Sequence, residues 1–140
     1  MLTDILIASK DEASTIFDQY PQRKDWSSLE LKGLDNFKLA ALLTVLGSTA
    51  EAEALEGEEC LVASNEDGPW LFLLPITFRD TLAALPISEF RAVAERWVTQ
   101  EDLAIDRWSV ADVEPCIGML NDHAKKSVEA GKHLLLWMSL

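Results

Sequence analysis

The last eight residues, HLLLWMSL (133–140), constrain the fold more than any other stretch of this chain. Their apolar side chains lie on both sides of an extended backbone, with Leu134, Leu136, Met138 and Leu140 on one side and Leu135 and Trp137 on the other. A strand of this kind is covered on both faces, which is typical of the inside of a sheet. We therefore predict an inner strand near a second strand at 4–8. The alternative is an exposed edge that pairs with another chain.

Helical signals recur between these two strands. Ser9 and Glu12 have the spacing of a capping box, and Pro21 ends the helix that they begin. Asp35 is a suitable N-cap and Gly47 a suitable C-terminal residue for a helix rich in Leu and Ala. Three further helices are expected at 77–85, 88–100 and 112–130. The acidic stretch 48–59 is expected to link elements rather than to pack, and the stretch around 101–108 to be irregular.

Strand signals complete the expected fold. Leu29 and Leu31 alternate with polar residues, which indicates a strand at 27–32 with one buried face. The residues NEDG (65–68) separate the apolar runs CLVAS (60–64) and PWLFLL (69–74), a pattern that predicts a hairpin. The chain is thus expected to form one α+β domain over 1–140. Its small mixed sheet includes 4–8, 27–32, 69–74 and 133–139, with about five helices packed on it.

The charge of the chain bears on its partners. The chain has twenty-four acidic and twelve basic residues, which gives a formal net charge of −12. Such a field repels phosphate backbones, so nucleic acid is not expected as a ligand and a basic protein becomes the favoured partner. The alternative is that the charge only keeps the surface solvated. We predict a partner-binding set from the acidic stretches and two tryptophans in polar surroundings: Glu51, Glu53, Glu56, Glu58, Glu59, Glu101, Asp102, Asp106, Trp26 and Trp108.

Motifs for catalysis or for cofactors do not occur in the sequence. There is no glycine-rich phosphate loop and no Gly-x-Ser-x-Gly. Cys60 and Cys116 are expected to be reduced and buried, and neither lies at metal-ligand spacing from a histidine. We expect His123 on a helix surface and His133 at the start of the last strand. No catalytic residue, metal or cofactor is predicted.

Cellular location is addressed by two features of the sequence. No apolar run approaches the roughly 20 residues that cross a bilayer. The opening residues, MLTDILIASKDE, lack the cationic and apolar parts of a secretory signal. A cytoplasmic protein without a membrane partner is therefore expected.

The order of these segments resembles the YfbM-like group of bacterial proteins of unknown function. The similar pieces are the N-terminal strand and helix, DWSSLELKGL (25–34), EDGPWLFLLP (66–75) with LAAL (82–85), and the final EAGKHLLLWMSL (129–140). The resemblance covers most of the chain loosely. It implies a single α+β domain and transfers no catalytic residue.

Two hypotheses of function follow. The first is a non-enzymatic role in protein binding, of the immunity type in which an acidic protein masks a basic partner. The second is a small hydrolase-like enzyme whose carboxylates line a pocket, which requires carboxyl groups with pKa values driven apart by their surroundings.

Overall fold

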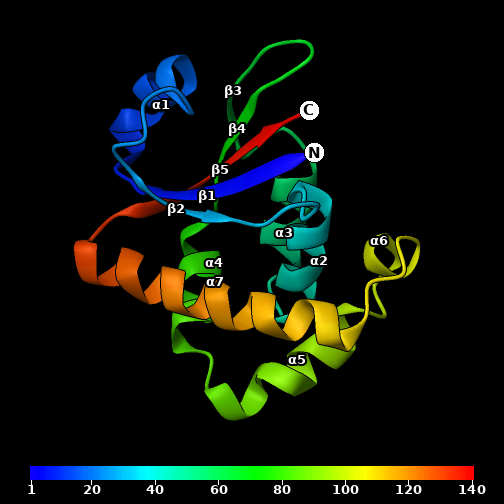
Figure 1. Cartoon of the computed structure of the whole chain (residues 1–140). Coiled ribbons are helices and arrows are strands. Elements are labelled where there is room, and N and C mark those ends of the chain that lie inside the picture. The colour runs from blue at the N-terminus through cyan, green and yellow to red at the C-terminus, as the bar shows by residue number, and fades with distance from the viewer.

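The computed structural model describes all of residues 1–140, and its centre is a five-stranded sheet (Figure 1). The strands are β1 (Leu2–Ala8), β2 (Ser27–Glu30), β3 (Leu61–Ser64), β4 (Trp70–Leu73) and β5 (His133–Ser139). Their order across the sheet is β2-β1-β5-β4-β3. The C-terminal strand β5 therefore lies inside the sheet, between β1 and β4, as predicted. The hairpin of β3 and β4 is also confirmed.

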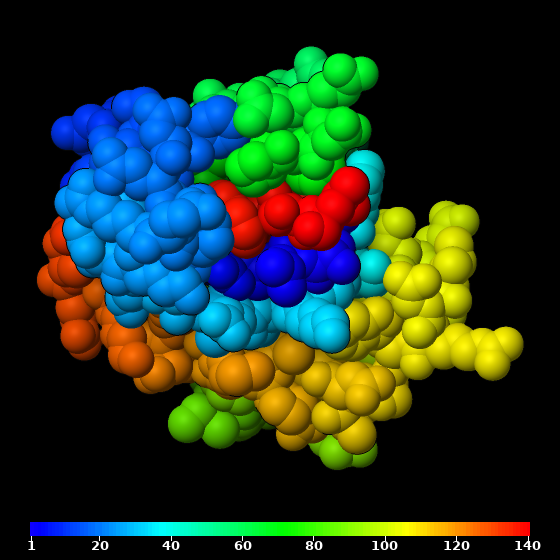
Figure 2. Space-filling model, turned by 45° about the horizontal axis from the view of Figure 1, so that its top comes forward, coloured from blue at the N-terminus to red at the C-terminus, as the bar shows by residue number.

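All four pairings in the sheet are antiparallel, where a mixed sheet was expected. Apolar runs without alternation are typical of parallel strands that helices cover on both faces. Here the same covering is achieved in an antiparallel sheet, because the segment between β1 and β2 folds back over one face. Figure 2 shows β5 in red between β1 in blue and the green hairpin.

Seven α-helices accompany the sheet, two more than expected. They are α1 (Ala13–Gln19), α2 (Asn36–Val45), α3 (Thr49–Glu56), α4 (Ile76–Ala84), α5 (Phe90–Trp97), α6 (Glu101–Ala104) and α7 (Val110–Ala130), with 3₁₀ turns at Lys10–Glu12 and Ile87–Glu89. The two extra helices are α3 and α6. The expectation that 48–59 only links is wrong, because Ala52 and Leu55 are buried and α3 packs along α2.

The helices divide into two unequal layers on the sheet (Figure 1). The main core lies between the sheet and the helices α2, α3, α4, α5 and α7. A smaller core lies on the other face, under α1, and consists of Leu6, Ala8, Ile16, Tyr20, Trp26, Leu71, Leu135 and Trp137. Strand β5 contributes to both cores, since its side chains alternate between them. This explains why its sequence is apolar at every position from 134 to 138.

Helix α7 is the longest element, and local signals define both of its ends. Ser109 and Asp112 form a capping box, in which each backbone N–H donates to the other residue's side chain at 2.9 and 3.2 Å. Gly131 ends the helix in the left-handed conformation, at φ +64°. Pro115, the sixth residue of the helix, has no N–H to donate to the carbonyl oxygen of Ala111, so the helix continues without that bond.

His123 on α7 is buried, at 6% exposure, and the expectation that it lies on the helix surface is wrong. Its Nε2 donates to the carbonyl oxygen of Ile5 on β1, at 2.8 Å. Burial lowers the pKa of the imidazole. The two cysteines are free and only half-buried, and burial raises the pKa of each thiol.

Candidate functional site

An apolar hollow of about 280 Å³ opens between the first turn of α2 and the strands β4 and β5. We call it the α2 hollow. Its lining residues are Met1, Asp35, Asn36, Phe37, Trp70, Phe72 and Met138. Phe72 and Met138 are buried, whereas Met1 and Phe37 are 48% and 47% exposed. The hollow therefore offers apolar surface to solvent at a place that the fold leaves partly open.

The cap of α2 positions the polar and aromatic parts of the α2 hollow. Asp35 is the N-cap, and its carboxylate accepts a hydrogen bond from the backbone N–H of Lys38 at 2.9 Å. This bond fixes the first helical turn, in which Asn36 faces the interior and Phe37 faces solvent. Both side chains consequently sit at the rim, on a rigid element rather than on a loop.

Residues 35–38 also connect the α2 hollow to the two acidic stretches. The amide Nδ2 of Asn36 donates to the carbonyl oxygen of Leu55 on α3, at 3.1 Å. Lys38 Nζ lies 2.8 Å from a carboxylate oxygen of Asp106, just beyond α6, and 3.8 Å from one of Asp35. One turn of α2 thus contacts both α3 and the segment after α6.

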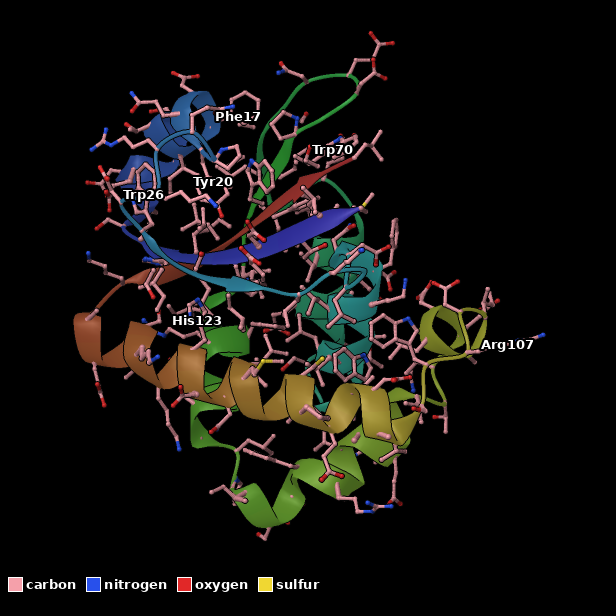
Figure 3. All side chains as sticks on the ribbon, viewed as in Figure 1. Phe17, Tyr20, Trp26, Trp70, Arg107 and His123 are labelled. Carbon is pink, nitrogen blue, oxygen red and sulfur yellow. The ribbon has the colours of Figure 1, made fainter.

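The two acidic stretches carry almost all of the net charge. Residues 48–67 hold seven acidic side chains and no basic one, and residues 101–114 hold five acidic side chains and one basic one, Arg107. Acidic and basic residues are nearly balanced over the rest of the chain. The net negative charge is consequently concentrated in these two stretches. In Figure 3, Arg107 projects away from the molecule beyond α6.

The acidic residues of the predicted partner-binding set mostly lie in solvent. Exposed side chains are those of Glu53, Glu56, Glu58, Glu59, Glu101, Asp102 and Asp106, while Glu51 is half-buried. Asp106 is the member that contacts α2, through its ion pair with Lys38. The structure therefore brings the two stretches to the same helix, although they are about 50 residues apart in sequence.

Neither tryptophan of the predicted set lines the α2 hollow. Trp26 is only 8% exposed and belongs to the smaller core under α1, where its Nε1 donates to Glu12 at 3.0 Å. Trp108 is half-buried and packs against the main core. Figure 3 shows Trp26 and Trp70 at opposite ends of the sheet.

Sequence reasoning missed the apolar members of the α2 hollow: Met1, Phe37, Trp70, Phe72 and Met138. These residues come from four separate segments that meet only in the folded chain. Phe37 alone had a local signal, as an aromatic residue between the cap Asp35 and Lys38 at the solvated start of a helix.

The carboxyl groups with shifted pKa values act as caps rather than as a catalytic pair. The pKa of Glu12 is lowered chiefly by the hydrogen bond from the backbone of Ser9, with a further contribution from Trp26. The pKa of Asp112 is lowered chiefly by the backbone hydrogen bond from Ser109. No group of three or more His, Cys, Asp or Glu side chains is arranged to hold a metal ion. The only carboxylate that lines the α2 hollow is Asp35.

Comparison with known proteins gives one relative in fold. No protein-family model and no curated protein matches the sequence. Among solved structures, the crystal structure of YfbM from Escherichia coli, a protein of unknown function, matches with a TM-score of 0.53 over 98% of this chain and 99% of YfbM. The two proteins share a fold. At 16% identity the likeness to YfbM extends to the fold alone, which confirms the α+β class expected from the resemblance. None of the helices in this fold is long and apolar enough to cross a membrane.

Proposed function

We propose that this chain is a bacterial cytoplasmic protein that acts by protein binding and masks a basic partner, in the manner of an immunity protein. The α2 hollow receives an apolar side chain of the partner. Basic residues around that side chain lie against the acidic stretches 48–67 and 101–114. The Escherichia coli origin of the structural relative YfbM supports a bacterial source.

The observation that supports this proposal is that the first turn of α2 lines the α2 hollow and also contacts both acidic stretches, at Leu55 and Asp106. Protein interfaces commonly combine an apolar centre, where aromatic residues contribute most of the binding energy, with a polar or charged rim. Phe37, Trp70 and Phe72 are the aromatic residues of the centre, and Asp106 pairs with Lys38 on the same turn of α2. An acidic surface intended only for solubility would not require exposed apolar residues at its middle.

The charge also predicts how the complex forms. A partner with a basic surface is attracted over a distance of about 10 Å at 0.1 M salt, and less at higher ionic strength. Such steering raises the association rate more than it lowers the dissociation rate. Association should therefore weaken with added salt, while the apolar contact at Phe37 should set the lifetime of the complex.

The test is affinity capture from the host with matched variants. The wild-type chain, Phe37→Ser and the triple variant Glu56→Gln, Glu58→Gln, Glu59→Gln are used as baits at low ionic strength. Phe37 is half exposed, so its replacement leaves the core intact. We expect a basic protein to be captured by the wild type and to be lost with both variants. Titration calorimetry of the purified pair should show at least about a tenfold weaker affinity for Phe37→Ser.

A charge-matched control separates a specific surface from general acidity. Asp18→Asn, Glu89→Gln and Glu129→Gln together remove the same charge from exposed positions outside the two stretches. This control should bind like the wild type. Equal loss in the control and in the Glu56, Glu58 and Glu59 triple variant, or unchanged capture by Phe37→Ser, would contradict the proposal.

A further inference from the structure

A second hollow, of about 320 Å³, lies at the far end of the sheet from the α2 hollow. It is bounded by the start of β2, the turn before α1 and the C-terminal end of α7. Three basic side chains from separate parts of the sequence line it: Arg23, Lys126 and Lys132. The remaining lining residues are Ile7, Glu12, Asp25, Trp26, Ser27 and Ala130. We call it the basic hollow, since it gathers three of the twelve basic residues of a strongly acidic chain.

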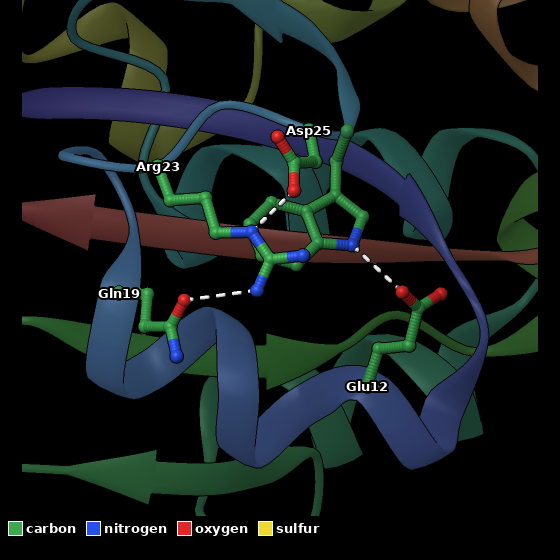
Figure 4. Close-up of polar contacts among 5 residues, drawn as sticks. Glu12, Gln19, Arg23 and Asp25 are labelled. Carbon is green, nitrogen blue, oxygen red and sulfur yellow. Dashed lines mark hydrogen bonds and ion pairs between the residues drawn. The ribbon is translucent and has the colours of Figure 1, made fainter.

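The guanidinium of Arg23 is held in place before any ligand arrives (Figure 4). Its Cζ lies 5.5 Å from the ring centroid of Trp26. Its Nε pairs with Asp25, and its Nη1 donates to Gln19 Oε1 at 3.0 Å. Nη2 has no hydrogen-bond partner within the protein. Nη2 therefore remains free to donate to an oxyanion, and the guanidinium that carries it is already oriented.

The position of Trp26 is itself supported by the chain around it. Its Nε1 donates to Glu12 Oε2 at 3.0 Å, and the other oxygen of Glu12 accepts from the backbone N–H of Ser9, also at 3.0 Å. The capping box of Ser9 and Glu12 thus holds the indole of Trp26, and the indole in turn lies against the guanidinium of Arg23. Such support reduces the conformational entropy that Arg23 would lose on binding.

The acidic residues of the basic hollow already have partners. Both oxygens of Glu12 accept hydrogen bonds, and Asp25 pairs with Arg23. Lys132, by contrast, is half-buried and makes no ion pair. Lys126 lies 3.5 Å from Asp122 on an exposed face of α7. Lys132 is therefore the one cation of the three that has no ion-pair partner.

Lysines at the end of α7 also offset the negative end of its dipole. That role accounts for Lys126 and Lys132, but it does not account for an arginine fixed from a different segment over the same hollow. We propose that the basic hollow binds a small oxyanion, the phosphate or carboxylate group of a low-molecular-weight ligand. Arg23 and Lys132 are its principal contacts, and Lys126 adds charge at the rim.

The proposal is tested by nuclear magnetic resonance titration with inorganic phosphate and, separately, with acetate, at constant ionic strength. The indole N–H of Trp26 and the backbone N–H of Ser27 are the reporters. We expect saturable shifts at both, and the anion that saturates at the lower concentration identifies the group that the hollow prefers. Linear shifts with both anions would overturn the proposal.

Variants show whether the effect belongs to this hollow. Lys132→Ala should weaken binding about tenfold or more, because it removes a charge-assisted contact. Gln19→Ala keeps the charge but removes one bond that orients Arg23, so it should weaken binding several-fold while the thermal transition is retained. Lys125→Ala is the matched control, since Lys125 is exposed on α7 and does not line the hollow. Equal effects of Lys125→Ala and Lys132→Ala would reduce the binding to general charge attraction and overturn the proposal.

Discussion

The Nε2 atom of His123 on α7 lies 2.8 Å from the carbonyl oxygen of Ile5 on β1. A carbonyl oxygen only accepts, so Nε2 carries a proton and donates it. The bond joins the long helix to a central strand across the main core, between residues 118 positions apart. Burial disfavours the charged imidazolium and lowers the pKa of His123, although the hydrogen bond to Ile5 acts in the opposite direction.

The first prediction concerns pH. A histidine with a pKa lower in the folded chain than in the unfolded chain adds stability above the unfolded value, 6.5. This contribution is lost as the pH falls through 6.5 toward the folded value, because the unfolded chain then binds the additional proton. We expect the free energy of unfolding, from urea titrations, to fall between pH 7 and pH 5.5.

The variant His123→Gln should reduce that fall, since glutamine does not titrate. Lys126 also lowers the pKa of His123 and Asp122 raises it, both to a smaller degree than burial. His133→Gln is the matched control, at a half-buried position that makes no side-chain hydrogen bond. If the free energy of unfolding of His123→Gln still fell between pH 7 and pH 5.5 as in the wild type, another titrating group would be responsible.

The second prediction compares two glycines with positive φ. A Cβ at Gly68, at φ +87°, would lie 2.7 Å from Cζ3 of Trp70, whereas a Cβ at Gly47, at φ +90°, would have no atom within 4 Å. Gly47→Ala should cost the backbone strain alone, about 1–2 kcal/mol. Gly68→Ala should cost about 1 kcal/mol more, because it also displaces the Trp70 ring. Urea titration measures both, and equal losses would contradict the steric argument.

Local signals accounted for much of the fold. The capping pair Ser9 and Glu12, the N-cap Asp35 and the terminal Gly131 each act within a few residues of the helix end that they define. The internal position of β5 was predictable for a different reason. Only a strand covered on both faces benefits from apolar side chains at every position from 134 to 138.

Features that depend on distant partners were not predictable. Ala52 and Leu55 are two apolar residues among glutamates, and only their contact with α2 makes that segment a packed helix. His123 follows an aspartate, which in the sequence indicates a solvated position. Only the folded chain brings its side chain to the carbonyl oxygen of Ile5. The acidic part of the candidate site was visible in the charge pattern. Its apolar centre was not, because the strand and helix segments of the α2 hollow converge only through the topology.

The third prediction concerns the ion pair between Lys38 on α2 and Asp106 beyond α6. The side chain of Lys38 is 9% exposed and that of Asp106 is 53% exposed. Solvent therefore screens the pair, and we expect Asp106→Asn to lower the free energy of unfolding by less than about 1 kcal/mol. Lys38→Met should be close to neutral, because a buried apolar chain replaces a buried cation. A double-mutant cycle measures the coupling, and a value well above 1 kcal/mol would show that the pair is poorly screened.

The last prediction concerns strand β5. Leu134 to Met138 are all buried, and β5 pairs with both β1 and β4. Burial of each large apolar side chain contributes roughly 1.5–3 kcal/mol, whereas the net stability of a domain is only about 5–15 kcal/mol. A chain that ends at Lys132 should therefore lack a cooperative thermal transition in circular dichroism, and should aggregate in gel filtration through the opened edges of β1 and β4.

Leu140→Ala is the control, since this residue is 77% exposed and lies beyond the strand, and it should melt like the wild type. If the truncated chain remained a folded monomer with an unchanged melting temperature, β5 would not be needed for the sheet, and its apolar residues would have to serve another chain.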